Sequence, residues 1–287
     1  MTPHDITIRD LEGPDELRAC RRFQGEVWGE TFSERVPVSI LTVTRRLGGV
    51  VAGAFDSAGE LAGFVFGMTG VVDGVVEHWS DMLAVRRDLR NAGIGRRLKA
   101  YQRERCLEIG VRRMRWTFDP LESRNAYMNL VHLGAVAPEY VRDMYGETDS
   151  PLHRGMETDR FVALWELDSE RTRARLQGRE RLPALVDVSG LPHAFPVKQR
   201  GPVPRPGVPD LGSVGSGPYL VPVPHNIQAI REEDGKLALA WRTATREALA
   251  PALEAGGRVE ELVLGAEAVS YYVVVRAGER DDTEVPR

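Results

Sequence analysis

The sequence has few cysteines, no excess of positive charge and no long apolar run. Cys20 and Cys106 are its only cysteines in 287 residues, which is too few for a disulfide scaffold and suits a reducing compartment. Thirty-eight basic residues stand against forty-two acidic ones, so no strongly positive field would hold a nucleic acid. No apolar stretch approaches the roughly 20 residues that span a bilayer, and residues 1–9 lack a secretion-signal pattern. We therefore expect a soluble cytoplasmic protein that binds neither nucleic acid nor membrane.

Composition changes sharply once, at a proline-rich stretch. Ten of the 18 prolines fall between Pro183 and Pro224, and proline disfavours helix interiors and central strands. We expect an extended arm here. The predicted organisation is a first domain over residues 1–169, a helix and linker arm over residues 170–217, and a small α+β extension over residues 218–287. About seventy residues bury little core alone, so the extension should pack on the first domain of its own chain or, in a homodimer, of a partner chain.

Before the arm, strand-like and helix-like patterns alternate. Residues that alternate between apolar and polar predict strands, and apolar residues three or four apart predict helices. The predicted strands are Ile6–Leu11, Val50–Phe55, Glu60–Met68, Val75–Val85, Val111–Phe118, Ala135–Tyr145 and Arg160–Leu167. The predicted helices are Asp15–Trp28, Val38–Leu47, Gly93–Ile109 and Ser123–Leu133. Antiparallel strands followed by a strand-helix-strand crossover predict a mixed sheet, and hence an α+β fold.

The most informative segment is a strand that runs through a glycine loop into a helix. The loop reads Arg90-Asn91-Ala92-Gly93-Ile94-Gly95. Glycines let the backbone approach a ligand closely, and a helix start offers free N–H groups and a positive dipole end. This combination predicts a pyrophosphate site, although a tight turn that binds nothing also accounts for two glycines. A dinucleotide fold and a nucleotide P-loop fit poorly, because Leu98 stands at the third glycine position and no Gly-Lys-Ser/Thr follows.

In this context the loop resembles the Arg/Gln-x-x-Gly-x-Gly/Ala signature of the GCN5-related N-acetyltransferases. The order of predicted elements over about residues 6–167 follows that family. The resemblance implies a fold whose fourth strand splays from the fifth, with an acyl-CoA co-substrate bound in the gap through the strand backbone and the loop amides. The implied cofactor-binding residues are Met82, Leu83, Ala84, Val85, Arg90, Asn91, Ala92, Gly93, Ile94, Gly95, Arg96, Asn125 and Asn129.

A narrower resemblance covers nearly the whole chain. Segments such as Trp116–Pro120, Leu133–Ala135 and Trp241-Arg242-x-x-Thr245-Arg246-Glu247 are similar to a subgroup of acetyltransferases with a C-terminal extension, some of which are associated with N-succinylation of amino acids. The resemblance implies transfer of an acetyl or succinyl group to the amine of a small metabolite. Two alternatives stay open: a protein or peptide N-acetyltransferase, and a regulatory module that binds acyl-CoA without catalysis.

Acyl transfer to an amine needs a base for the ammonium proton and hydrogen-bond donors for the oxyanion. Asp81 is the first candidate base, because it stands nearest the cofactor strand in sequence, and Glu77 and His153 are the others. Strand alternation places Glu77, Trp79 and Asp81 on one face and His78 on the other, unless a bulge exchanges the faces. The resemblance implies that a backbone N–H near Leu83 serves the oxyanion.

The family's usual acid is a tyrosine four residues before the glycine that ends the later helix, and this position is Leu130 here. The departure is the best support for the non-catalytic alternative and leaves Tyr145, Tyr127 or Tyr140 as substitutes. Trp79 and Arg160 are the candidate substrate-binding residues, the latter because a guanidinium binds a carboxylate bidentately. Exposed strand residues and surface ion pairs explain most of these side chains equally well. The six histidines are scattered, so we expect no metal site.

Overall fold

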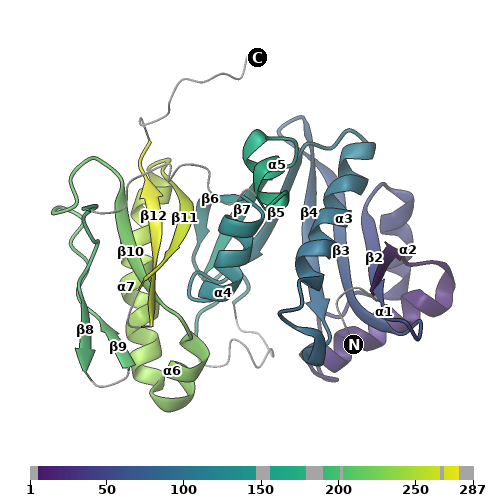
Figure 1. The fold of residues 1–287 in the computed structure, drawn as a ribbon, viewed down its shortest axis with the longest axis horizontal. Helices are drawn as coiled ribbons and strands as arrows, with labels where there is room; N and C mark the ends of the chain where they lie inside the picture. Colours follow the sequence, from purple (N-terminus) through teal and green to yellow (C-terminus); the bar gives the residue numbers. More distant parts are fainter. Residues whose placement is uncertain (1–5, 147–155, 179–189, 201–202, 266–267, 278–287) are drawn as a thin grey trace. The chain divides into compact units, whose positions relative to one another are not determined.

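The computed structural model describes residues 6–146, 156–178, 190–200, 203–265 and 268–277 (Figure 1). The chain divides into two compact units. Unit 1 comprises residues 1–116, 145–156 and 165–176, and unit 2 comprises residues 117–144, 157–164 and 177–287. The chain therefore passes between the units several times.

Unit 1 is built on a mixed sheet. Its elements are β1 (Thr7–Asp10), α1 (Gly13–Trp28), α2 (Val38–Arg46), β2 (Val50–Phe55), β3 (Leu61–Val72), β4 (Val75–Val85), the 3₁₀ turn η2 (Arg87–Leu89), α3 (Ile94–Glu108), the first part of β5 (Arg113–Phe118), the end of β7 (Arg160–Glu166) and α5 (Glu170–Leu176). The strands β1 to β4 are antiparallel neighbours in sequence order, and β5 joins β4 in parallel. This arrangement confirms the predicted α+β class, and the predicted elements are all present with shifts of a few residues at their ends.

Different helices cover the two faces of this sheet (Figure 1). Phe64 and Phe66 of β3 belong to the apolar cluster that packs against Phe23 of α1. A Cβ added at Gly63 or Gly67, the alternate positions of β3, would instead meet side chains of α3. Because successive strand residues point to opposite faces, α1 and α2 cover one face and α3 covers the other. Cys20 and Cys106 are both buried, and burial raises the pKa of each thiol to about 12.

Unit 2 contains the later strands and two longer helices. Its elements are α4 (Ser123–Ala126), the π-helical turn η3 (Tyr127–His132), β6 (Val136–Val141), most of β7, β8 (Val197–Arg200), β9 (Val203–Pro206), β10 (Tyr219–Pro224), α6 (Ile227–Glu233), α7 (Gly235–Glu254), β11 (Arg258–Leu264) and β12 (Val269–Val275). The strand order in this unit is β7-β6-β11-β12-β10, with antiparallel neighbours. The strands β8 and β9 form a separate antiparallel pair.

Parts of the proline-rich stretch form strands. Residues 203–206 form β9, and the Pro204 carbonyl accepts a hydrogen bond of 3.1 Å from the Trp241 indole. Pro222 and Pro224 lie in β10, which is the last strand of its sheet. A two-stranded pair and an edge strand tolerate the missing N–H of proline, so these extended segments can pair as strands without forming a helix or a central strand.

The extension shares a core with residues that precede the arm. The Tyr272 ring packs edge-on against Phe161 at 5.3 Å, and its hydroxyl donates to the Pro120 carbonyl at 2.7 Å. Strand β11 pairs with β6 through Val259 and Ala137. These contacts confirm that the extension packs on residues assigned to the first domain. The proposed domain boundaries at residues 169 and 217 stay a prediction.

No helix in the described part of the chain is long and apolar enough to cross a membrane. Within the same residues, no group of three or more metal-ligating side chains is close enough to hold an ion.

Candidate functional site

The edge of β4 that faces β5 is open over the predicted cofactor strand. The pairing of these strands consists of Glu77–Arg113, His78–Met114 and Trp79–Arg115, whereas β4 continues through Val85. For Ser80–Val85 the described pairings of β4 are with β3 alone. An open strand edge presents unpaired N–H and C=O groups, so this stretch of unit 1 can bond to an extended ligand such as a pantetheine arm.

The loop after β4 provides a cluster of backbone amides. Asn91 and Gly93 adopt the left-handed conformation, with φ of 65° and 77°, and Gly93 caps α3 without any side-chain hydrogen bond. The first amides of a helix have no partner within it, and left-handed turns of this kind form anion-binding concavities. A Cβ at Gly93 would meet no protein atom within 4 Å, so the space beside this residue is open to a ligand. The loop geometry fits a pyrophosphate.

Arginine side chains around the loop differ in what they can bind. Arg96 donates to the carbonyls of Arg175 and Leu176 at 2.8 and 3.1 Å. Arg97 donates to the Ile6 carbonyl at 2.6 Å. These guanidinium groups tie α3 to neighbouring backbone. Arg90 is exposed, with a long contact of 3.4 Å to the Val85 carbonyl, and it remains available to an anion.

A β-bulge sits where β4 becomes the open edge. Phe66 pairs with Met82 and Gly67 pairs with Ser80, so Asp81 is an extra residue on β4. The bulge exchanges faces: Ser80 bonds to α3, whereas Met82 packs on the α1 side. Asp81 lies on the surface beside the open edge. Partial desolvation of its carboxylate and the like charge of Glu34 raise the pKa of Asp81.

Glu34 is a site residue that the sequence reasoning missed. It lies between α1 and α2, and its negative charge acts on Asp81. Nothing in the sequence connects residues so far apart, because their proximity depends on the packing of α1 and α2 against the sheet.

Glu77 is placed as a structural ion pair. Its carboxylate is buried and accepts from the Arg115 guanidinium at 2.6 Å, and Arg113 lies 3.9 Å away. Both arginines belong to β5, so the pair joins the two strands just where their backbone pairing occurs. Trp79 is half-buried on the same strand. Of the two carboxylates predicted on β4, only Asp81 stands free of an ion pair in the described residues.

His78 belongs to a buried hydrogen-bond chain. Thr69 donates to the Gly48 carbonyl at 2.9 Å, so Nδ1 of His78 donates to Thr69 at 3.0 Å and Nε2 accepts from Gln102 at 3.0 Å. Burial, reinforced by the charge of Lys99, lowers the pKa of His78 to about 3. The ring is therefore neutral at physiological pH and faces away from Asp81.

Lys99 lies at the end of this hydrogen-bond chain and is the second site residue that sequence reasoning missed. Its ammonium donates to Ser80 at 2.7 Å and lies 3.8 Å from the centre of the Trp116 ring. Ser80 in turn donates to Gln102 at 2.9 Å. Burial lowers the pKa of Lys99 to about 7. A buried lysine of α3 thus holds Ser80, the residue that precedes the bulge.

The remaining predicted catalytic residues are placed elsewhere or lie outside the described residues. His153 lies outside them. Tyr145 belongs to unit 1, is 45% exposed and follows β6 in a turn. Tyr140 is buried in unit 2 against Asp159, and burial raises its pKa far above the usual range, so it is a poor acid. Leu130 is fully buried, and its apolar side chain cannot serve as an acid at that helix position.

The predicted asparagines and Arg160 lie in unit 2. Asn129 is buried in η3, and its amide donates to the exposed Asn125 at 3.3 Å. A π-helical bond joins the Leu133 amide to the Met128 carbonyl at 3.0 Å, and π-helical turns often occur at functional sites. The Arg160 side chain is 7% exposed and lies 3.5 Å from Asp119, and its role in substrate binding stays a prediction.

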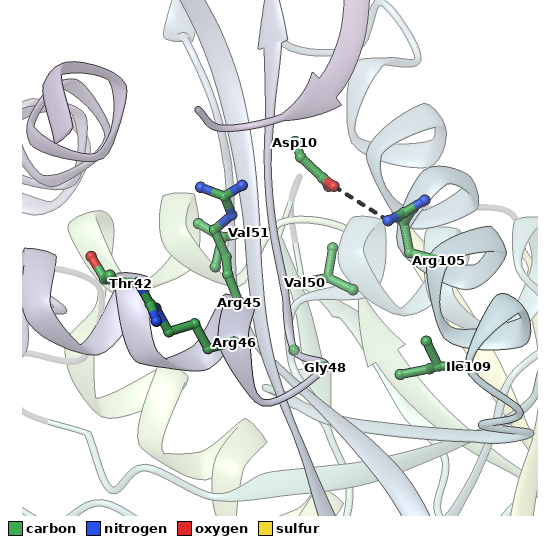
Figure 2. A pocket seen from close by; sticks show the side chains of 10 residues that line it. Asp10, Thr42, Arg45, Arg46, Gly48, Val50, Val51, Arg105 and Ile109 are labelled. Atoms are coloured by element: carbon green, nitrogen blue, oxygen red, sulfur yellow. Dashed lines mark ion pairs between the residues drawn. The ribbon is translucent and has the colours of Figure 1, made fainter. Parts of the chain in front are cut away.

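Unit 1 also contains a cavity of about 520 Å³ apart from the glycine loop (Figure 2). Its lining comes from α2, the start of β2, the end of β1 and α3, and includes Arg45, Arg46 and Arg105. Arg105 and Asp10 form an ion pair with a distance of 3.5 Å between Nη2 and Oδ2, which a dashed line marks in Figure 2. None of its lining residues belongs to β4 or to residues 90–96, so this cavity is separate from the candidate cofactor site.

No family model and no curated protein matches the chain. Among solved structures, the chain is similar to an acetyltransferase of the GNAT family from Streptococcus pneumoniae, with 18% identity and a TM-score of 0.45 over 55% of this chain and 98% of that one. It is also similar to the ribosomal-protein-S18-alanine N-acetyltransferase from Escherichia coli, with 18% identity and a TM-score of 0.44 over 57% and 95%. A third is NAA60 from Arabidopsis thaliana in complex with acetyl-CoA, with 15% identity and a TM-score of 0.45 over 56% and 99%. Because these identities and TM-scores are low, we base the assignment of the site on the geometry of this chain.

Proposed function

We propose that the protein is an acyl-CoA-dependent N-acyltransferase that acts on the amine of a small metabolite. The observation that carries the proposal is the open edge of β4 over Ser80–Val85, which the short turn η2 connects to the amide cluster of residues 91–96. Edge and cluster lie in the order in which a CoA thioester presents its pantetheine arm and its pyrophosphate. The limited pairing of β4 with β5, over Glu77–Trp79 and Arg113–Arg115, also agrees with the splayed strands that the sequence resemblance implies.

Binding in this scheme is carried mainly by backbone groups. The N–H and C=O groups of Met82–Val85 bond to the pantetheine amides, and the amides of Asn91–Arg96 bind the pyrophosphate at the positive end of the α3 dipole. The exposed guanidinium of Arg90 adds a positive charge. The Arg96 side chain contributes indirectly, because it holds the start of α3 against the end of α5.

In the reaction, the acceptor amine attacks the thioester carbonyl carbon and the C–S bond breaks to release the thiolate. Asp81 is the proposed base that accepts the ammonium proton, directly or through water. A raised pKa brings a carboxylate nearer to the value that suits a base at neutral pH, and the bulge presents Asp81 at the start of the open edge. A backbone N–H near Leu83 is proposed to stabilise the oxyanion. Because leucine, which has no proton to donate, stands at position 130, we propose that solvent protonates the thiolate.

The test is a thiol-release assay with purified protein, acetyl-CoA and succinyl-CoA, each paired with the common amino acids and with short peptides. Calorimetric titration with coenzyme A gives binding independently of turnover. Turnover with an amino acid supports the proposal, and turnover with peptides alone favours a peptide N-acetyltransferase. Binding of CoA with no turnover favours a regulatory module, and the absence of both contradicts the cofactor site. The cytoplasmic location and the homodimer remain predictions.

A further inference from the structure

The cavity of unit 1 lies at the edge of the sheet, where strand β1 ends (Figure 2). Strand β1 pairs with β2 as far as Asp10 and Ala52, so Val50 and Val51 at the start of β2 lie beyond the last pair. Helix α2 covers one face of this sheet and α3 covers the other, and residues of both helices line the cavity. Its volume of about 520 Å³ falls in the range of small-molecule sites, which is about 300–1,000 Å³.

Three arginines line this cavity, and they come from the last turns of two helices. Arg45 and Arg46 belong to α2, and Arg105 belongs to α3. In the view of Figure 2, the two α2 residues lie on one side of Val50 and Arg105 lies on the other. The helix dipole favours a cation at the end of a single helix. That preference does not explain why two helix ends place three arginines at one cavity.

Little negative charge balances these arginines. Among the described residues that line the cavity, only Asp10 is acidic. Its carboxylate accepts a hydrogen bond of 3.0 Å from the Tyr101 hydroxyl and pairs with Arg105 at 3.5 Å. Glu108 also pairs with Arg105, but its side chain is 57% exposed, and an exposed pair of this kind contributes little. The lining therefore carries three positive charges against one negative charge.

The guanidinium groups of Arg45 and Arg46 are available to a ligand. Both residues are exposed, and within the described ranges neither side chain forms a hydrogen bond or an ion pair. The charge of Arg45 acts on Glu16, but the Glu16 carboxylate already accepts hydrogen bonds of 2.7 and 2.6 Å from Arg9. The α2 side of the cavity thus offers two positive charges that no described carboxylate neutralises by direct contact.

The wall at the end of α2 is held in place without a ligand. The Gly48 carbonyl accepts a hydrogen bond of 2.9 Å from Thr69, which in turn accepts from His78 at 3.0 Å. The Gly49 amide donates to the Thr44 carbonyl at 2.9 Å, and a Cβ at Gly49 would come within 2.3 Å of the Thr44 side chain. A site whose walls are already ordered loses less conformational entropy when a ligand binds.

We propose that this cavity binds a small organic phosphate, a monoester whose phosphoryl group contacts Arg45, Arg46 and Arg105. Guanidinium groups bind phosphate oxygens through paired, planar hydrogen bonds. A phosphate monoester presents three free oxygens and a charge of about −1.5 to −2 at neutral pH, which suits three arginines better than one carboxylate group does. A carboxylate has two oxygens, and a single guanidinium can satisfy both.

The rest of the lining suits the organic part of such a ligand. Val50, Val51 and Ile109 provide apolar surface beside the arginines, and small-molecule sites combine apolar walls with a few polar groups. The formal charge of the whole chain is −4, so a nucleic acid would not be attracted to the protein as a whole. This site lies apart from the glycine loop and goes beyond the proposed acyl transfer.

Calorimetric titration of the full chain at fixed ionic strength tests the inference. Phenyl phosphate is the probe, because it joins a phosphoryl group to an apolar body, and the dicarboxylate phthalate tests whether carboxylates serve equally well. The double variant Arg45→Gln with Arg46→Gln should weaken phenyl phosphate binding at least about tenfold. Arg21→Gln with Arg22→Gln is the matched control, because it removes two adjacent exposed arginines of α1, and it should bind as the wild type does.

Arg105→Gln provides a second variant, on the other helix, if the α2 double variant fails to fold, and it should weaken phenyl phosphate binding several-fold. The inference is overturned if the wild type does not bind phenyl phosphate, if phthalate binds as tightly, or if the cavity variants bind as the control does. Loss of binding in Arg90→Gln with the cavity variants unaffected would place the phosphate at the glycine loop and also overturn it. Because no acyl-CoA is present in these titrations, their outcome does not depend on the proposed function.

Discussion

At the scale of single residues, Asp81 is the side chain on which the proposed chemistry depends most. It is the extra residue of a bulge, it lies at the start of an open strand edge, and its pKa is raised by desolvation and by Glu34. A carboxylate held in these conditions is more basic than an ordinary aspartate and stays in contact with solvent. These are the properties that proton removal from an ammonium group needs.

Replacing this base should lower activity without harming the fold. We expect Asp81→Asn to reduce turnover at saturating substrates by about 10²–10⁴-fold. The unfolding temperature at neutral pH should not fall, because a carboxyl group whose pKa is raised in the folded state destabilises the protein once ionised. A loss of activity smaller than tenfold in a folded variant would transfer the role to a water molecule or to another residue.

The influence of Glu34 on Asp81 can be measured separately. The like charge of Glu34 contributes to the raised pKa of Asp81, so Glu34→Gln should lower that pKa. The base is active when deprotonated, and activity is lost as the pH falls through its pKa. The acid side of the pH–rate profile should therefore move to lower pH in the variant. Glu26→Gln, an exposed change on α1, is the matched control, and an identical shift in both variants would contradict the assignment.

Lys99 provides a stability prediction that is independent of catalysis. Its pKa is lowered to about 7 in the folded protein, from 10.5 for a free lysine side chain. Between these two values the unfolded chain binds more protons than the folded chain at this residue, so the wild type gains stability as the pH rises through this range. Lys99→Met removes the titration.

Thermal unfolding of wild type and Lys99→Met at several pH values from 7 to 10 checks this sign. The wild type should gain stability relative to the variant across the series. Lys236→Met, at an exposed position of α7, should follow the wild type. Parallel pH profiles for all three proteins would show that Lys99 does not titrate in this range.

At the scale of elements, the sequence predicted the strands and helices of unit 1 well, because the apolar periodicities there are clear. It allowed for a bulge in β4 but did not locate it. By strict strand alternation, residues 78, 80, 82 and 84 should all face the same side of the sheet. In the structure, however, Ser80 faces α3 and Ala84 faces α1. Only the pairing with β3 shows where the extra residue lies. The side of the sheet on which a candidate base lies therefore depends on a tertiary feature that periodicity does not record.

The polar interior was equally hidden from the sequence. Lysine is almost never fully buried unless paired, so Lys99 reads as a surface residue of α3. Arg242 likewise reads as a polar position on an amphipathic helix. In both cases the residue type predicts an exposed side chain. The side chain is buried because segments distant in sequence pack over it, which the sequence does not show. The glycine loop was predictable because its chemistry is contained in six consecutive residues.

At the scale of elements, we predict that the glycine loop binds coenzyme A. Gly93→Ala should weaken coenzyme A binding at least about tenfold, because the new methyl group occupies the open space beside the amide cluster. Gly59→Ala is the matched control. Gly59 has φ of 79°, as Gly93 has 77°, and neither added Cβ meets a protein atom within 4 Å. Each variant should lose about 1–2 kcal/mol of stability from the left-handed backbone.

Calorimetric titration with coenzyme A separates the two effects. If the loop binds the pyrophosphate, only Gly93→Ala loses affinity, while the two variants unfold at similar temperatures. Equal affinities in both variants would rule out the loop as the binding site.

At the scale of the whole molecule, the extension is part of the core of unit 2. Trp241 and Tyr272 are fully buried, and a buried aromatic side chain removes about 150–250 Å² from water. A chain that ends at Leu176, which retains the α5 carbonyls bound by Arg96, should therefore expose apolar surface. We expect it to bind a hydrophobic dye and to aggregate. A soluble, monomeric and fully active product would show that the extension is an independent appendage.

The path of the chain between the units has a consequence for inheritance. Residues 117–144 and 157–164 belong to unit 2, while residues 145–156 and 165–176 return to unit 1. No single cut in the gene separates the two units, so recombination between related genes at one crossover would join halves that do not match. The two units must be passed on together, and natural variants of this architecture should differ by substitutions and loop insertions rather than by exchange of whole domains.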